Sequence, residues 1–189
     1  ASDVYKRQAP TLSSPVIGKD GTLRVGVNAD SAPLAGQLSD SGKIVGVDVD
    51  IAAALADSFG LKLEIVDVGA DPEGALSDGR VDIVMGIDKS DTDTTFWKSE
   101  AYLPTAVALF STASNTAVPT NASKRSIAAQ VSSKSAWAGT NAFDQGTITT
   151  TDNLMNAFSD LESGQVQSVA ADAAIGTYAA YNAGDDVQI

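Results

Sequence analysis

The chain has 189 residues, of which 43% are hydrophobic and 19% charged, a composition typical of a soluble globular protein with one domain or two small lobes. Its formal net charge of −12 gives a surface that repels nucleic acid and anionic lipid, so we expect neither as a partner. The sequence contains no Cys and no His, which excludes thiol chemistry, disulfides, Cys/His zinc sites and any histidine-based triad.

The first half of the chain alternates predicted strands and helices. Three apolar, β-branched runs are predicted to be strands, over 22–27, 61–68 and 81–85. A helix is predicted over 51–59, where apolar residues recur at helical spacing, and a shorter one over 71–79. Because the order is β-α-β-α-β, we expect a parallel sheet with right-handed crossovers.

The second half continues this alternation. Further strands are predicted from apolar or β-branched runs, over 103–112, 126–131, 147–151, 166–171 and 186–189. Helices are predicted between them, over 136–143, 152–164 and 173–183. The segments 76–81 and 161–166 share the pattern Leu-x-x-Gly-x-Val, each between a helix and a buried strand. This repeated pattern has two interpretations. It indicates two homologous lobes, or it reflects only the helix–Gly–strand connection that is common in α/β proteins.

Polar residues follow several of the predicted strands. Asn28, Asp30 and Ser31 come after the first strand, Asp88 lies in the polar loop that follows 81–85, and Asp172 ends the strand over 166–171. In α/β proteins the carboxyl ends of parallel strands are where ligands bind. We therefore expect these positions to belong to a ligand site.

The segment Gly46-Val-Asp-Val-Asp-Ile-Ala-Ala-Ala-Leu-Ala resembles the signature of the family 3 extracellular solute-binding proteins, the polar amino-acid receptors of ABC importers. Other segments resemble family landmarks in the same order along the chain, at 21–27, 76–83, 99–102 and 161–172. The resemblance covers about 18–189.

The resemblance implies a two-lobed α/β clamp of the periplasmic-binding-protein type II class, with the ligand between the lobes. Each lobe is expected to be a mainly parallel sheet flanked by helices, with lobe 1 over 18–104 and lobe 2 over 105–189. Residues 1–17 lack the apolar region of a signal peptide and are interpreted as a flexible N-terminal linker or scar. The final return to lobe 1 is expected to be missing, as in a C-terminally truncated chain.

The resemblance also implies how the ligand is held. Ser132 and Ser133 fall on the family's Gly-Ser/Thr position at a helix start, where backbone N–H groups bind an anion, and Lys134 is next. Asp172 falls on the aspartate that binds the ligand's ammonium group. The alternative role of Asp172 and of the two serines is to cap the helices that follow them.

One family contact is absent, because Asp93 stands where the carboxylate-binding Arg is expected. Either Lys89 or Lys134 supplies the cation, or the ligand is not a standard α-amino acid. No catalytic residue, metal or cofactor is expected. The expected ligand-binding residues are Asn28, Asp30, Ser31, Gly86, Asp88, Lys89, Ser90, Ser132, Ser133, Lys134 and Asp172.

Two pairs of residues are expected to be structural. Asp48 and Asp50 belong to the family signature and are interpreted as helix caps, at positions where N-caps and first-turn acids belong. Trp97 and Tyr102 are interpreted as core or hinge packing rather than as platforms for a ligand.

The predicted function is extracellular capture of an amino acid or related small polar solute for an ABC importer. The alternatives are a ligand-binding sensor domain and a dehydratase-like enzyme on the same fold. The expected partners are the solute and an ABC permease, and the protein is expected to be a monomer. We expect an extracellular or periplasmic location, with lipid anchoring through an N-terminal Cys that this sequence does not contain.

Overall fold

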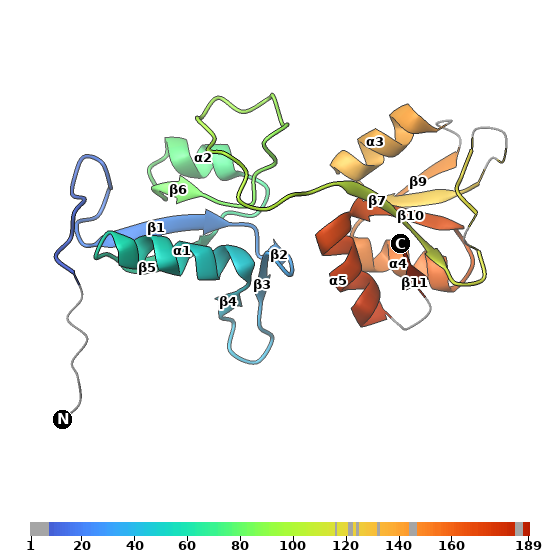
Figure 1. The fold of residues 1–189 in the computed structure, drawn as a ribbon, viewed down its shortest axis with the longest axis horizontal. Helices are drawn as coiled ribbons and strands as arrows, with labels where there is room; N and C mark the ends of the chain where they lie inside the picture. Colours follow the sequence, from blue (N-terminus) through green and yellow to red (C-terminus); the bar gives the residue numbers. More distant parts are fainter. Residues whose placement is uncertain are drawn as a thin grey trace. The chain divides into compact units, whose positions relative to one another are not determined.

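The computed structural model describes residues 8–115, 117–120, 123, 125–131, 133–143, 147–183 and 187–189. The chain divides into two compact units, unit 1 over Ala1–Tyr102 and unit 2 over Leu103–Ile189. The predicted lobes divide it two residues later, after Pro104. Each unit contains its own sheet and its own helices (Figure 1).

The main sheet of unit 1 is parallel, as predicted. Strand β1 (Thr22–Val27) lies at its centre, between β5 (Lys62–Asp67) and β6 (Ile83–Val84), and both neighbours run parallel to it. Helix α1 (Val47–Ser58) and the short helix α2 (Pro72–Ser77) connect the strands in sequence. The β-α-β-α-β order read from the sequence is therefore confirmed.

Alternate residues of this sheet face two different helices. Val25 and Val27 are fully buried in a cluster that includes Ala52 and Ala56 of α1. On the other face, Val66 and Val84 join a cluster around Ala75 of α2. The period of two along a strand assigns each side chain to one of these layers.

Residues 8–17 pack on unit 1, which corrects the prediction that 1–17 lie outside the fold. Ile17 is buried in the cluster beneath α1, and Leu12 packs against the same cluster. The backbone N–H of Thr11 donates to the carbonyl oxygen of Phe59 at 3.0 Å. This segment carries few apolar residues, and its partners are remote in sequence, so local patterns did not reveal it. Residues 1–7 lie outside the described part of the chain.

A small antiparallel sheet occupies a stretch that the sequence indicated to be turns. Its strands are β2 (Asp30–Ser31), β3 (Ala35–Gln37) and β4 (Ile44–Val45), paired in the order β2-β3-β4. Strands of two or three residues are too short for an alternating pattern to be recognised.

Unit 2 contains a five-stranded mixed sheet in the order β11-β7-β10-β8-β9. Its strands are β7 (Val107–Thr112), β8 (Ile127–Gln130), β9 (Ile148–Thr151), β10 (Ser168–Asp172) and β11 (Val187–Gln188). β8, β9 and β10 run parallel, whereas β7 is antiparallel to both β10 and β11. The carboxyl ends of the three parallel strands therefore meet at one edge.

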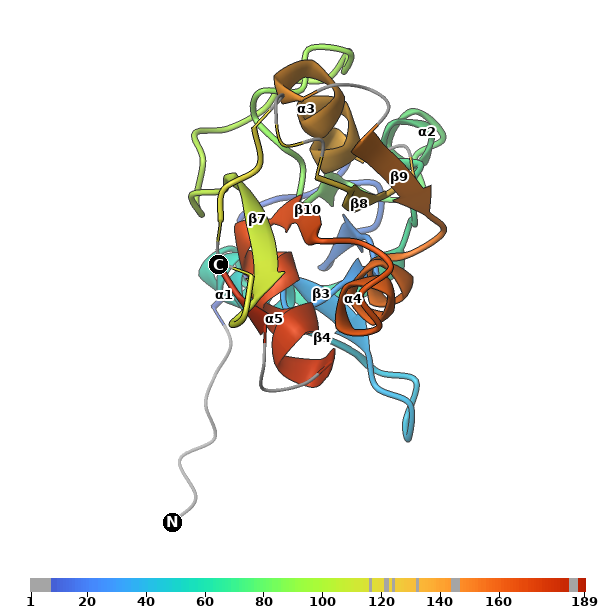
Figure 2. The ribbon, with the colours of Figure 1, turned by 90° about the vertical axis from the view of Figure 1, so that its right-hand side faces the viewer.

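Helices cover both faces of the sheet in unit 2. α3 (Lys134–Ala142) lies on one face, and α4 (Leu154–Glu162) and α5 (Ala173–Ala183) lie on the other (Figures 1 and 2). Phe158 of α4 packs edge-on against Phe110 of β7, with ring centroids 5.4 Å apart and ring planes at 78°. Ile127 and Ala136 belong to a separate cluster on the α3 face. Within the described residues, no helix is both long and apolar enough to cross a membrane.

Candidate functional site

In unit 1, the polar residues predicted to bind a ligand begin at the carboxyl edge of the parallel sheet. Gly26 of β1 is paired with Val84 of β6, and Asn28 and Gly86 each come two residues later. The two chain segments therefore leave the sheet at the same edge, as a ligand site of the predicted kind requires.

The turn after β1 is closed by its own polar groups. Asn28 Oδ1 accepts the backbone N–H of Asp30 at 3.0 Å, and the Asn28 carbonyl oxygen accepts that of Ser31 at 3.2 Å. On the adjacent strand, Asp67 Oδ1 accepts the N–H of Ala29 at 3.2 Å. Asp30 itself is exposed and starts β2. These hydrogen bonds place the exposed side chain of Asp30 at the edge of the sheet.

The loop after β6 is folded around its own acidic residues. Asp88 Oδ1 accepts hydrogen bonds from Ser90, from its backbone N–H at 2.8 Å and from its hydroxyl at 2.7 Å. Lys98 Nζ donates to the carbonyl oxygens of Asp88 and Asp91. The side chain of Lys98 therefore links two backbone positions of this loop, Asp88 and Asp91, to the segment that follows the loop.

Lys89, one of the two cations proposed to replace the missing Arg, forms an ion pair with Glu100. The hydrogen bond from Lys89 lowers the pKa of Glu100 below its ordinary value. Both side chains are well exposed, so the pair contributes little to stability. A ligand carboxylate at Lys89 would share its ammonium group with Glu100, since this group has three donors.

Asp48 and Tyr102 form a contact that the sequence did not reveal. Asp48 is only 2% exposed, and its Oδ1 accepts the Tyr102 hydroxyl at 2.8 Å. The same hydroxyl oxygen accepts the backbone N–H of Gly86 at 2.9 Å. Burial raises the pKa of Asp48, and burial together with the hydrogen bond to Asp48 raises the pKa of Tyr102 to about 12.

The sequence placed Asp48 and Asp50 at the start of a helix as caps and first-turn acids; the first-turn position is confirmed, and the capping role is wrong. The N-cap residue is Gly46, and no side chain caps this end of the helix. Both aspartates lie in the first turn, where a negative charge is favourable next to the helix dipole. The interpretation of Trp97 as packing is also wrong, because its side chain is 86% exposed.

In unit 2, the start of α3 has the geometry expected of an anion-binding helix terminus. Ser133 is the N-cap, and its Oγ accepts the backbone N–H of Ala136 at 3.0 Å. Lys134 is the first residue of the helix. The backbone N–H groups of a first helical turn have no partner within the helix and favour a negative group nearby. Ser132, predicted to share this site, lies outside the described residues.

Asp172 ends β10 and caps α5, which is the alternative role considered for it. Its Oδ1 accepts the N–H groups of Ala174 at 2.9 Å and Ile175 at 3.0 Å. Its Oδ2 accepts the hydroxyl of Thr105. A carboxylate has about four lone-pair positions, so these three bonds are compatible with an additional donor from a ligand.

Asp172 and the start of α3 lie at the same edge of the sheet in unit 2. β8 and β10 are parallel neighbours, with Ala128 paired to Val169. Asp172 is the last residue of β10, and Ser133 follows the end of β8. An acidic acceptor and a helix N-terminus are thereby combined at one edge.

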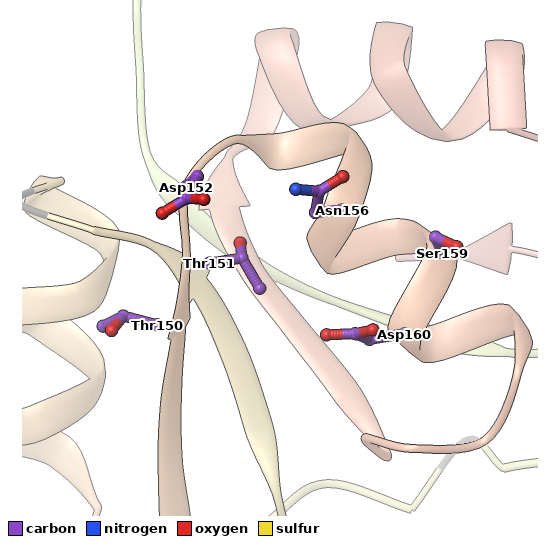
Figure 3. A pocket seen from close by; sticks show the side chains of 6 residues that line it. All are labelled: Thr150, Thr151, Asp152, Asn156, Ser159 and Asp160. Carbon is purple, nitrogen blue, oxygen red and sulfur yellow. The ribbon is translucent and has the colours of Figure 1, made fainter.

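A separate polar pocket lies between the end of β9 and α4 in unit 2 (Figure 3). It has a volume of about 310 Å³ and contains none of the predicted ligand residues. Its lining residues are Thr150, Thr151, Asp152, Asn156, Ser159 and Asp160. Among the described residues, no group of three or more acidic side chains is arranged to hold a metal ion.

Each unit thus places some of the predicted ligand-binding residues at the carboxyl edge of its own parallel strands. Unit 1 places the turn after β1 and the start of the loop after β6 at one edge, and unit 2 does the same for Ser133, Lys134 and Asp172. Sequence reasoning missed the roles of Asp48, Lys98 and Thr105. The only signal for Asp48 was its place in the segment that resembles a family signature.

Comparison with known proteins gives consistent results. Residues 23–172, more than half of the chain, match the family model described as bacterial extracellular solute-binding proteins, family 3. No curated protein sequence matches the chain.

Several solved structures have the same fold. An ancestral cationic amino acid solute-binding protein, AncCDT-1, is 28% identical with a TM-score of 0.72, over 89% of this chain and 75% of that one. A second structure of AncCDT-1, described as a precursor of cyclohexadienyl dehydratase, is 28% identical with a TM-score of 0.68, over 86% and 75% of the two chains. The arginine-bound form of truncated ArgBP from T. maritima is 25% identical with a TM-score of 0.66, over 89% and 81%.

Proposed function

Because the chain belongs to the bacterial extracellular solute-binding proteins of family 3, which capture small polar solutes, we propose that its solute is a cationic amino acid delivered to an ABC importer. Two of the similar structures support this class of ligand, since one is described as a cationic amino acid-binding protein and the other is arginine-bound. The charge of the chain agrees, because a net charge of −12 favours the approach of a cationic solute.

The observation that carries the proposal is the combination of Asp172 with the N-terminus of α3 at one edge of unit 2. An amino acid carries an ammonium group and a carboxylate on the same carbon. Asp172 accepts the ammonium group, and the first N–H groups of α3, together with Lys134, receive the carboxylate.

The loop after β6 in unit 1 carries three acids, Asp88, Asp91 and Asp93. Asp93 stands where the resemblance leads us to expect an Arg, so unit 1 is better suited to a positive side chain than to a carboxylate. Two lysines lie beside these acids: Lys89 is paired with Glu100, and Lys98 Nζ donates to the carbonyl oxygens of Asp88 and Asp91.

A thermal-shift series tests this assignment. L-arginine, L-lysine and L-ornithine are each expected to raise the melting temperature, and L-glutamate is expected to have no effect. A ligand present at 100 times its Kd stabilises the folded state by about 2.7 kcal/mol. A shift with L-glutamate but with none of the cationic amino acids contradicts the proposal.

The variant Asp172→Asn separates the ligand role of this residue from its capping role. Asparagine caps a helix about as well as aspartate, but it has no charge to attract an ammonium group. We expect D172N to fold normally and to lose the arginine-induced shift. The control is Asn153→Asp at the N-cap of α4, which exchanges the same two side chains in the opposite direction and should leave the arginine shift unchanged.

We further propose that the protein acts outside the cytoplasm as a monomer, docks to an ABC permease and is anchored by a lipid. We propose that it is a binding protein rather than an enzyme, as most of its similar structures are. The dehydratase alternative has one relevant observation, the description of AncCDT-1 as a dehydratase precursor. Incubation with a cyclohexadienol carboxylate, followed by mass spectrometry for the loss of water, tests this alternative, and we expect the compound to be recovered unchanged.

A further inference from the structure

We propose that Asp48 and Tyr102 are positioning residues for the loop 86–93 of unit 1. They fix the position of Gly86, the first residue of this loop. This inference rests on the proposed function, because it assigns Gly86 and the residues after it to the solute site. Neither Asp48 nor Tyr102 is placed in contact with the solute. They act through the backbone N–H of Gly86.

The Tyr102 hydroxyl connects two points that are distant in sequence. It donates to Asp48 on α1 at 2.8 Å and accepts from the N–H of Gly86 at 2.9 Å. Gly86 is the first residue of the loop and Tyr102 is the last residue of unit 1, so the contact closes the segment 86–102, which contains the loop, at its base. α1 is a twelve-residue helix packed on the core, which makes it a rigid anchor for this base.

The directions of these two hydrogen bonds are fixed by the groups involved. A backbone N–H can only donate, so the tyrosine oxygen must accept from Gly86 and its proton must point elsewhere. The buried carboxylate of Asp48 accepts the hydrogen bond that this O–H group donates. Removing the hydroxyl therefore leaves both Asp48 and the Gly86 N–H without this partner.

Gly86 is fitted closely against Asp48. Its φ of 78° lies in the left-handed region that favours glycine, and a Cβ at this position would lie 2.9 Å from Asp48 Oδ2. Gly79 has a similar φ of 67°, but a Cβ there would meet nothing within 4 Å. The close approach at Gly86 thus belongs to the contact with Asp48 and not to the backbone turn alone.

The rest of the loop has its own attachments. Lys98 binds the carbonyl oxygens of Asp88 and Asp91, and Thr95 donates its N–H to Glu73 Oε1 of α2 at 3.2 Å. These contacts hold the loop from Asp88 onward and the segment that follows it, whereas Tyr102 holds Gly86. Loss of the Tyr102 hydroxyl should therefore loosen the loop 86–93, most of all at its first residues, and leave unit 1 folded.

Amide hydrogen exchange on the ligand-free protein tests the proposal directly. We expect Tyr102→Phe to speed exchange at 86–93 by about tenfold, the effect of losing roughly one hydrogen bond, with exchange in α1 and β1 unchanged. Tyr178→Phe is the matched control, because Tyr178 is 44% exposed and Tyr102 is 45% exposed. Equal exchange in the two variants at 86–93 overturns the proposal.

The second measurement is the Kd for L-arginine by isothermal titration calorimetry. We expect Y102F to weaken binding by about tenfold, and Gly86→Ala to weaken it more than Gly79→Ala, which carries the same left-handed strain. Unchanged arginine affinity in Y102F, with faster exchange at 86–93, overturns the positioning role. If the wild-type protein binds no cationic amino acid, the proposed function fails, and the exchange result still decides whether Tyr102 holds the loop.

Discussion

The carboxylate of Asp82 accepts hydrogen bonds from both the backbone and the guanidinium of Arg24, a residue 58 positions earlier in the chain. Its Oδ1 also accepts the N–H of Gly18 at 2.8 Å. One acidic side chain thereby joins β1, the segment before β6 and the N-terminal segment. Burial alone would raise the pKa of Asp82, but the hydrogen bonds from Arg24 and Gly18 lower it below its ordinary value.

The first prediction concerns the loss of this carboxylate. Asp82→Ala leaves the largely buried guanidinium of Arg24 without its acidic partner, and we expect a loss of about 3 kcal/mol in the free energy of unfolding. Urea denaturation followed by far-UV circular dichroism measures it. Glu64→Gln is the control, because the Lys19–Glu64 pair is exposed and should contribute less than about 1 kcal/mol. A similar loss in both variants contradicts the prediction.

The second prediction is that Asp82 and Asp48 give opposite pH dependences of stability. The pKa of Asp82 is lower in the folded state, so its stabilisation is present above about pH 4 and is lost as the pH falls through the folded pKa. The pKa of Asp48 is raised by burial, so its ionisation lowers stability as the pH rises from about 4 through the folded pKa.

Urea midpoints of the wild type, Asp82→Asn and Asp48→Asn between pH 3 and pH 7 measure these two effects. On acidification, the wild type should lose its advantage over D82N and should gain relative to D48N. Parallel curves for the three proteins would show that neither carboxyl has a perturbed pKa.

The third prediction compares two buried helical glycines of unit 2. A Cβ on Gly176 of α5 would lie 2.5 Å from Phe110 Cε2, and Phe110 is held by Phe158. Gly176→Ala should therefore destabilise the protein by about 1 to 3 kcal/mol, despite the higher helix propensity of alanine.

Gly139→Ala in α3 is the matched control for that variant. A Cβ there would meet the terminal Cδ1 of Ile148 at 3.1 Å, and the end of a side chain can move aside. We expect G139A to be neutral or to gain up to about 1 kcal/mol from helix propensity. Thermal unfolding of the two variants side by side tests the comparison, which fails if G139A is the less stable.

The fourth prediction concerns the stability of Asp172 variants without ligand. Asp172→Ala removes the acceptor for the Ala174 and Ile175 N–H groups and should cost about 1 to 2 kcal/mol. Asp172→Asn keeps an N-cap side chain and should cost much less. Equal losses in urea denaturation would show that the charge, rather than the cap, stabilises the start of α5.

The sequence predicted the elements whose signals are local. β1, β5 and β10 follow continuous apolar or alternating runs, and Phe158 and Leu161 repeat at helical spacing in α4 and are buried. The carboxyl edge of each parallel sheet followed from the order of these elements. Asp172 was predicted at such an edge, and its capping role was considered beside its role in binding.

The remaining features depend on pairs that are distant in sequence. Asp48 and Tyr102 are 54 positions apart, and Asp82 and Arg24 are 58 apart, so no window of the sequence contains either pair. Ile17 was missed because the strand and helix residues of its cluster come later in the chain. The exposure of Trp97 was missed because it follows a second aromatic residue, Phe96, and an aromatic pair gives no local indication of whether each side chain is buried.

The exposure of the two tryptophans has a practical consequence. Trp97 in unit 1 is 86% exposed, and Trp137 on α3 in unit 2 is 70% exposed. Because both indoles are already in water, their fluorescence emission should lie at long wavelength in the folded protein and should shift little on unfolding. A blue shift upon addition of a solute would instead signal that an indole has lost water, and Trp97→Phe and Trp137→Phe would assign that signal to one unit.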